Sequence, residues 1–467
     1  MSRELVIETI PSGAHAGLLD DGVLIEVDVV DAGEKAPRGA IFLGRVKTID
    51  PDLDAAFIDC GLDQDAYLNG RDARFLTRQP RGTPIGQQLR EGDAIVVQIR
   101  REAEGGKAPR VTTDVMLAGP TVVYRPYHDD IELSGRLARS WEREAQRERA
   151  TELFPEGGVL LRRAALVTDD AQLVAEVGRL RALWEAIETK AEQSTAPAVL
   201  HRLDDPLLRI LAARASPDLE RVVVADRTTL ARARAILSEW QPALLDRLEC
   251  VPRAFEATGA AEQLEEALQP EVPLPQGGSL VIEPTAALTA IDVNSGGRRA
   301  LDVNLEAAGE IARQLRLRRI GGTIVVDFVD LPSRRDRARL FSALRPAFAE
   351  DPLPVQVFPM SPLGLVEISR RRTGRSLAEQ LGRLCPSCGG AGLLPALSQQ
   401  AERLASALAE RGTQRVRVRV APDLKAHLET AGAELWRDFA ERQGSTPALD
   451  VDPTLRPGDF VIDEKTG

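Results

Sequence analysis

Hydrophobic and polar residues alternate over residues 1–38, with the two-residue period of half-buried β-strands. The clearest stretch runs from Val23 to Val30. A segment this short cannot bury a core by itself, so we expect its strands to pair with a distant segment. Residues 201–276 offer one, because an apolar strand at 221–226 is followed by a helical pattern at 229–239.

Residues 39–119 carry short apolar stretches separated by turn residues, a pattern typical of a small closed β-barrel, with strands predicted at 40–46, 55–59 and 94–99. Phe57 and Tyr67 stand near strand ends, and Lys107 and Arg110 follow a glycine turn. On an OB-type barrel, aromatic rings flanked by cations form a base-stacking surface in a charged groove. The alternative for Phe57 is the barrel core, which is the commoner place for a phenylalanine in a strand.

The next segment, residues 120–200, mixes strand and helix. The pattern predicts a solvated charged helix at 138–151, a strand at 159–163 that ends in Arg162 and Arg163, and an amphipathic helix at 171–195. Proline and glycine at 270–278 indicate a domain boundary. The tail, residues 395–467, predicts a small α/β domain.

Two aspartates interrupt strand-like apolar stretches within residues 277–380. Asp292 follows the stretch 288–291, and Asp327 lies inside 323–329. A buried carboxylate costs several kcal/mol unless it is paired, hydrogen-bonded or bound to a metal. With Asn294 close by, the pair suggests carboxylates that converge on a cation. The alternative is an Asx-turn at Asp292 and a strand end at Asp327 whose carboxylate accepts backbone N–H groups.

A helix separates the two aspartates. We expect Asn304 to cap it, the helix to run to Arg319, and Gly321 and Gly322 to end it. Around the aspartates the chain carries Arg313, Arg316, Arg318, Arg319, Arg334, Arg335, Arg337, Arg339, Arg370, Arg371, Arg372 and Arg375. Guanidinium groups around a magnesium site suit a phosphodiester substrate. The alternative is that these arginines cover solvated helix faces.

Composition limits the class of protein. The 467 residues are 43% hydrophobic and 28% charged, which is typical of a globular chain of several domains. A net charge of −11 argues against indiscriminate nucleic-acid binding. Four cysteines do not build a disulfide framework, and no apolar run suits a signal peptide or a membrane span. We therefore expect a cytoplasmic protein.

Cys385 and Cys388 form a CxxC knuckle followed by glycines. Structural zinc takes four ligands, and no other Cys or His is near in the sequence. Half a site on one chain suggests that an identical chain supplies the second half. The alternative is a turn that binds no metal.

Taken together, these segments resemble the catalytic region of the RNase E/G family of bacterial endoribonucleases. The resemblance rests on residues 44–46, 53–59, 288–295, 304–308, 310–318, 321–330 and 385–388. It implies an α/β multidomain fold, in the order RNase H-like subdomain (1–38 and 201–276), inserted OB-fold domain (39–119), 5′-end sensor (120–200), DNase I-like catalytic subdomain (277–380), zinc link (381–394) and small C-terminal domain (395–467).

The resemblance also implies chemistry. Asp292, Asn294 and Asp327 would hold catalytic Mg²⁺, and Cys385 and Cys388 would share structural Zn²⁺ between protomers of a homodimer or a dimer of dimers. Single-stranded RNA, as rRNA precursors and mRNA, would be cleaved to a 5′-phosphate and a 3′-hydroxyl. Phe57, Tyr67, Lys107 and Arg110 would bind RNA, and Arg162 and Arg163 would sense a 5′-phosphate.

The chain departs from the family pattern around the substrate. The loop at 296–303 is shorter, Arg162-Arg163 replaces an Arg-Thr pair, and Gly135 replaces a sensor arginine. The family's arginine ahead of its Gly-Leu-Leu-Glu segment has no counterpart in 360–365. Since the chain ends at residue 467, we expect it to lack the long tail of larger RNase E enzymes and to be closer to RNase G. Two other classes stay open, a non-catalytic RNA-binding protein with this fold and a ribosome assembly factor.

Overall fold

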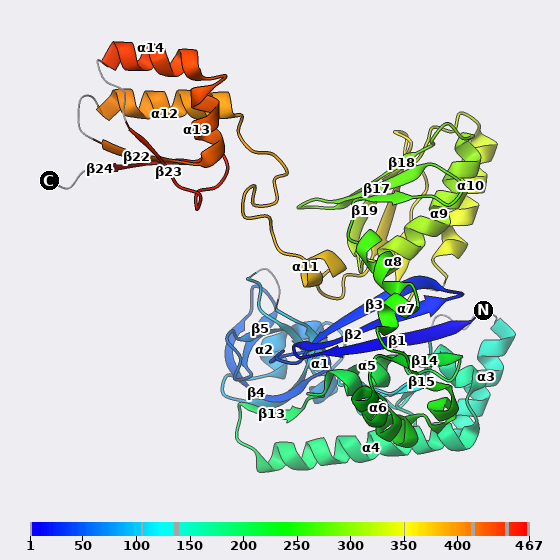
Figure 1. Cartoon of the computed structure of the whole chain (residues 1–467). Coiled ribbons are helices and arrows are strands. Elements are labelled where there is room, and N and C mark those ends of the chain that lie inside the picture. Colours follow the sequence, from blue (N-terminus) through cyan, green and yellow to red (C-terminus); the bar gives the residue numbers. More distant parts are fainter. Residues whose placement is uncertain are drawn as a thin grey trace. The chain divides into compact units, whose positions relative to one another are not determined.

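The computed structural model describes residues 2–103, 106–134, 140–349, 351–411, 416–443 and 448–464. The fold is mixed α/β, and the chain forms two compact units, Met1–Gln380 and Leu381–Gly467. Figure 1 labels the helices and many of the strands of both units. Among the described residues, every helix is too short or too polar to span a membrane.

The N-terminal sheet has the strand order β15-β14-β1-β2-β3. Its strands are β1 (Arg3–Ile10), β2 (Gly13–Asp20), β3 (Val23–Asp31), β14 (Arg221–Val224) and β15 (Leu248–Cys250). Strand β1 pairs with β14 in parallel, with Glu4 opposite Arg221. The prediction that the first strands pair with a distant segment is therefore confirmed. Helices α5 (Pro206–Arg214) and α6 (Arg227–Trp240) share a buried apolar core with this sheet.

A closed five-stranded barrel is inserted after β3. It consists of β4 (Ile41–Asp50), β5 (Ala55–Asp59), β6 (Ala66–Asn69), β8 (Arg110–Thr112) and β7 (Ala94–Arg101) in that order, and pairing of β4 with β7 closes it. Strand β13 (Ala198–His201) extends the sheet beside β4. The connections include α1 (Gly70–Thr77) and α2 (Ile85–Gln88). The barrel predicted from the short strands is confirmed.

A small sheet follows the barrel, in the order β11-β12-β10-β9. Its strands are β9 (Leu117–Ala118), β10 (Val122–Tyr124), β11 (Ile131–Leu133) and β12 (Val159–Leu161). The long helix α4 (Asp170–Gln193) contributes Leu173, Val177 and Leu180 to the core beneath this sheet. The charged helix predicted at 138–151 is α3 (Ser140–Leu153), and the start of that prediction lies outside the described residues.

The carboxylate sheet, named for the aspartates it carries, has the order β16-β17-β18-β19-β21-β20. Its strands are β16 (Glu271–Pro273), β17 (Ser279–Pro284), β18 (Thr289–Asn294), β19 (Gly322–Asp327), β20 (Val355–Val357) and β21 (Leu365–Arg370). Helices α9 (Ala300–Leu317) and α10 (Arg334–Ala347) lie beside this sheet in Figure 1, and their apolar residues share one buried core with its strands. The short helices α7 (Ala254–Ala257) and α8 (Ala260–Glu266) precede it. Since β16 pairs with β17, the sheet begins at Glu271, within the segment expected to be a boundary.

The second unit, Leu381–Gly467, has the predicted α/β character. Its sheet has the order β23-β22-β24, formed by β22 (Val416–Val420), β23 (Leu449–Val451) and β24 (Phe460–Glu464). Helices α12 (Leu397–Arg411), α13 (Pro422–Glu429) and α14 (Ala433–Gln443) contribute to its own apolar core. The short helix α11 (Leu377–Leu381) lies where the two units join in the sequence.

Candidate functional site

The two aspartates occupy neighbouring positions in the carboxylate sheet. Strands β18 and β19 run parallel, and Asp292 lies directly opposite Asp327. Neighbouring strands in a sheet are about 4.8 Å apart, so both carboxylates can reach one cation. The Asn294 amide donates to Asp292 Oδ2 over 3.0 Å. The expectation that the aspartates come together is met by the register of the strands.

Both carboxylates are exposed, in contrast to the sequence-based argument. From the sequence, Asp292 and Asp327 were expected to be charges inside buried strands. Side chains alternate between the two faces of a strand, and here Ile291, Val293 and Val326 take the buried face. The aspartates therefore stand on the open face and carry no burial cost. Asp327 is also the last residue of β19. The alternative prediction, that Asp327 lies at a strand end, is therefore correct for the backbone.

Asn304 fixes the segment that follows Asp327. It was expected to cap the helix, but α9 starts earlier, and Asn304 lies buried in its second turn. Its Nδ2 donates to the Val329 carbonyl over 2.7 Å, and its Oδ1 accepts from the Val329 N–H over 3.1 Å. Satisfying both backbone groups of Val329 ties the exit of β19 to the helix.

Most of the nearby arginines serve the fold rather than an open site. Arg313 pairs with Glu310, and Arg370 is buried against Asp351 at 2.8 Å. Arg318 is buried beside Gln314. The expectation of twelve guanidinium groups around the aspartates is therefore wrong for these arginines. Four of the twelve arginines make no side-chain hydrogen bond or ion pair within the described part of the chain. They are Arg319, Arg334, Arg335 and Arg371.

The donor set at Asp292 and Asp327 fits a hard divalent cation. Magnesium is usually bound by one or two carboxylates and several waters, and an amide oxygen is a further acceptable ligand. In the described part of the chain, no three His, Cys, Asp or Glu residues gather closely enough to hold a metal. The open face of the carboxylate sheet supplies two carboxylates and the Asn294 amide, and water would fill the remaining positions around a cation.

Phe57 and Tyr67 form an aromatic pair on the outside of the barrel. They lie opposite each other on β5 and β6, with ring centroids 6.1 Å apart in an edge-to-face arrangement. Both are half-buried, whereas Ala56 and Ile58 beside Phe57 fill the barrel core. The Arg110 guanidinium lies 5.5 Å from the Tyr67 ring centroid. The core alternative for Phe57 is thus wrong.

Lys107 is exposed after the turn, and no contact joins it to the ring pair among the described residues. The structure therefore brings Phe57, Tyr67 and Arg110 together. Lys107 is close to Arg110 in the sequence but is not part of this contact.

Arg162 and Arg163 line a cavity of about 570 Å³. Arg162 donates from Nη1 to the Gly119 carbonyl over 2.7 Å, and burial lowers its pKa. Three further arginines line the same cavity, Arg3, Arg214 and Arg316. Arg3 and Arg214 were not predicted as site residues, and Arg316 was expected near the aspartates instead. They come from widely separated segments, and no local pattern connects them. Gly135, in place of an expected sensor arginine, lies outside the described residues.

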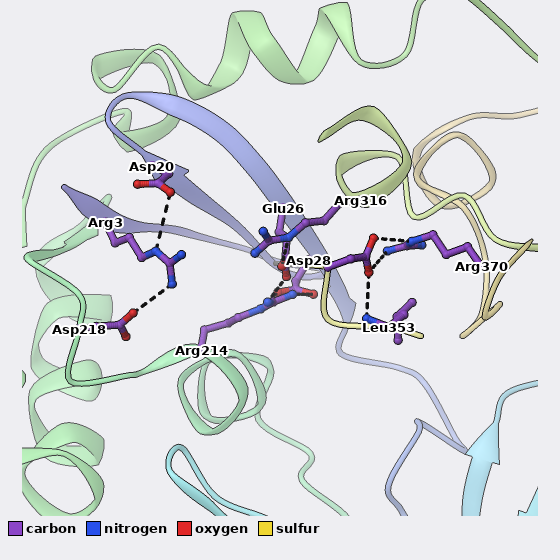
Figure 2. A network of polar contacts seen from close by, with 10 residues as sticks. Arg3, Asp20, Glu26, Asp28, Arg214, Asp218, Arg316, Leu353 and Arg370 are labelled. Carbon is purple, nitrogen blue, oxygen red and sulfur yellow. Dashed lines mark hydrogen bonds and ion pairs between the residues drawn. The ribbon is translucent and has the colours of Figure 1, made fainter. Parts of the chain in front are cut away.

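Glu26 joins two of these arginines, as Figure 2 shows. It accepts from Arg214 of α5 and from Arg316 of α9, and Asp28 also accepts from Arg214. Burial opposes the charge of Glu26, but the two guanidinium groups outweigh burial and lower its pKa to about 2. This ion network connects the N-terminal sheet to the helix that lies between the aspartates.

Cys385 and Cys388 lie in the second unit, in a turn where the Gly389 N–H donates to the Cys385 carbonyl over 2.8 Å. Cys385 is exposed, and a hydrogen bond from the Cys388 backbone is the main cause that lowers the pKa of its thiol. A low thiol pKa favours the thiolate that binds zinc. Among the described residues no third ligand lies close to them, so one chain offers at most two of the four ligands that structural zinc takes.

Known proteins similar to this chain share one family. A protein named ribonuclease E from Nostoc sp. is 37% identical over 370 residues, covering 76% of this chain and 54% of that protein. Ribonuclease E from Synechocystis sp. is 35% identical over 372 residues, covering 76% and 55%. Ribonuclease G from Escherichia coli is 32% identical over 415 residues, covering 84% of each. This chain thus spans about half the length of the two ribonuclease E relatives.

The family model described as the Ribonuclease E/G family matches residues 116–373, which include Asp292, Asn294 and Asp327. This match covers more than half of the chain. The chain belongs to the ribonuclease E/G family.

Proposed function

We propose that this chain is an endoribonuclease that hydrolyses single-stranded RNA to a 5′-phosphate and a 3′-hydroxyl. The observation that carries the proposal is the register that sets Asp292 opposite Asp327 on the open face of the carboxylate sheet. The names of the relatives, ribonuclease E and ribonuclease G, support the substrate class. Processing of rRNA precursors and turnover of mRNA in the cytoplasm are the roles that we infer.

Asp292 and Asp327 would hold Mg²⁺, with Asn294 as a third oxygen ligand. When bound, the ion would polarise the phosphodiester and lower the pKa of a water molecule. Asn294 keeps the Asp292 carboxylate oriented through its 3.0 Å hydrogen bond. The hydrogen bonds between Asn304 and Val329 fix the end of β19, and this keeps Asp327 opposite Asp292 of β18. These residues position the scissile phosphate and the attacking water.

The ring pair on the barrel would bind the substrate strand. A base can stack on Phe57, and Arg110 beside Tyr67 can meet the phosphate backbone. Lys107 would add charge at the edge of this surface. This arrangement favours single strands, because the bases of a duplex are not free to stack on protein side chains.

The test is to replace each aspartate by its amide. Asp292→Asn and Asp327→Asn should each slow cleavage of a 5′-labelled oligoribonucleotide by at least about 100-fold, since metal-assisted charge stabilisation contributes several kcal/mol. RNA affinity should change little. Glu283→Gln, an exposed carboxylate on the adjacent strand β17, serves as the matched control and should cleave normally.

Two outcomes would contradict the proposal. Retention of more than about a tenth of the rate by both amide variants would remove the pair from the mechanism. RNA binding without any magnesium-dependent cleavage by the natural chain would favour a non-catalytic RNA-binding protein that keeps this fold.

We also propose that Arg162 and Arg163 contact a 5′-phosphate, but weakly. Arg162 already donates to the Gly119 carbonyl, and Arg214 and Arg316 in the same cavity already form ion pairs with Glu26. These arginines are therefore less available to a phosphate. We expect cleavage of 5′-monophosphate RNA to exceed that of 5′-hydroxyl RNA by less than about tenfold, or 1.4 kcal/mol. Paired substrates that differ only at the 5′ end measure this ratio. A hundredfold preference would show that the ion network opens to admit the phosphate.

A further inference from the structure

A second cavity, of about 680 Å³, lies within the unit Met1–Gln380. It is lined by β3, the barrel, β9, α4, α5, α6, the segment just after α9 and part of residues 373–380. Neither the two aspartates with Asn294 nor Arg162 contributes to it. Small-molecule sites typically enclose about 300–1,000 Å³. The cavity is therefore large enough for a ligand. Ala213 lines both cavities, but none of the residues assigned above to metal, RNA or phosphate binding lines this one.

One wall of the cavity is apolar and carries an indole. Leu180 and Leu183 of α4 and Ile210 of α5 line it, together with Trp240, the last residue of α6. Trp240 is half-buried, and none of the ring pairs found among the described residues involves it. Its ring can therefore stack on a planar ligand.

The cavity also carries guanidinium groups that lack partners. Arg38, Arg179 and Arg319 line it, and in the described part of the chain their guanidinium groups make no hydrogen bond or ion pair. Burial is the first cause that lowers the pKa of Arg38, and the nearby charge of Arg319 is the next, while the Glu102 carboxylate opposes both without cancelling them. Two neighbouring guanidinium groups repel each other unless an anion lies between them. A phosphate matches their planar donor geometry.

A pair of carboxyl groups provides the third recognition element. Glu34 accepts from Arg209 over 3.0 Å, and Glu102 accepts from the Arg38 backbone N–H over 2.9 Å. Glu34 and Glu102 are close enough to interact, and both line the cavity. Carboxylates at nucleotide sites accept hydrogen bonds from ribose hydroxyls.

The other carboxylates of the lining do not oppose an anionic ligand strongly. Asp28 is neutralised by Arg214, and Glu176 accepts from Thr121 and from backbone N–H groups. Asp31 and Glu239 are exposed to solvent, which screens them.

We propose that this cavity binds a free mononucleotide, with the base against Trp240, the ribose hydroxyls at Glu34 and Glu102, and the phosphate between Arg38 and Arg319. Since the lining comes from the barrel, the N-terminal sheet and the segment after α9, a bound nucleotide would favour one arrangement of these parts. The proposal concerns binding and stands apart from the ribonuclease activity.

Isothermal titration of the full chain tests it, with adenosine 5′-monophosphate, adenosine and inorganic phosphate as separate probes. The monophosphate should bind, and each of its two fragments should bind at least about tenfold more weakly. Arg319→Gln and Trp240→Leu should each weaken binding of the monophosphate by about tenfold or more. Arg234→Gln, an exposed arginine of α6 outside the cavity, is the matched control and should bind normally.

Thermal melting shows whether Arg319→Gln and Trp240→Leu fold. If either variant does not fold, Arg179→Gln is titrated in its place. Absence of binding by the natural chain at millimolar monophosphate would overturn the proposal. So would binding that persists in Arg319→Gln and Arg179→Gln but is lost in Arg162→Gln, because that result places the ligand in the other cavity. Tighter binding of a 5′-phosphorylated dinucleotide than of the monophosphate would show that an RNA end, and not a free nucleotide, is the ligand.

Discussion

At the scale of single residues, the face of a strand on which a side chain stands decides what it can do. Asp292 and Phe57 both sit in apolar stretches, and both were open to a purely structural reading. Alternation along β18 and β5 places each of them away from the core, while their neighbours Val293 and Ile58 are buried. The sequence contained this alternation, but not the facing register of Asp292 and Asp327, which depends on how two strands align.

Phe57 gives a prediction at this scale. Phe57→Ala should weaken binding of single-stranded RNA by about 1–3 kcal/mol, the contribution of one stacked base. Thermal stability should fall only slightly, because Phe57 is half-buried outside the barrel core. Binding titrations and melting curves on the same protein measure both quantities.

The matched control is Phe42→Ala, since Phe42 is almost fully buried in the barrel core. That change should cost about 3–5 kcal/mol of stability. An equally large loss of stability in Phe57→Ala would mean that Phe57 supports the barrel rather than the RNA.

At the scale of helices and strands, local sequence patterns predicted the elements well, but they did not predict the side-chain contacts between elements. The strand at 221–226 and the helices at 171–195 and 229–239 are present with small shifts at their ends. Asn304 was assigned a cap because its side chain suits that position, yet its partner is Val329. Glu26 binds arginines on α5 and α9 that no periodic pattern relates to β3. Such contacts are set by packing between distant segments.

The ion network of Glu26 predicts how stability depends on pH. The pKa of Glu26 is lowered from 4.5 to about 2, so the folded state favours the charged form. Its contribution, about 3 kcal/mol, is fully present above about pH 4.5 and is lost as the pH falls toward 2. The midpoint of urea unfolding should therefore fall across this range, and Glu26→Gln should reduce the dependence.

At neutral pH, Glu26→Gln should cost about 3–5 kcal/mol, because it leaves Arg214 and Arg316 with an incomplete partner. Glu249→Gln removes an exposed partner of Arg221 and should cost about 1 kcal/mol or less. Equal effects of the two substitutions would show that the network around Glu26 contributes no more than a surface ion pair.

At the scale of the whole molecule, the chain divides after Gln380, and the cysteine knuckle falls in the second unit. The paired aspartates and both cavities fall in the first. An assembly joined through the knuckle would therefore link protomers without using any group of the proposed cleavage site. This separation makes assembly and chemistry testable by different substitutions.

We predict half a zinc per chain, in a homodimer or a dimer of dimers. Cys385 and Cys388 supply two thiolates, and a structural zinc site is closed only with four ligands, so two chains complete it across a two-fold axis. Metal analysis together with light scattering measures the ratio and the mass. Chelation or Cys385→Ser should dissociate the dimer, whereas Cys250→Ser, in β15 of the first unit, should leave it intact. One zinc per chain in a monomer would refute the shared site, because the metal would then have found its remaining ligands within a single chain.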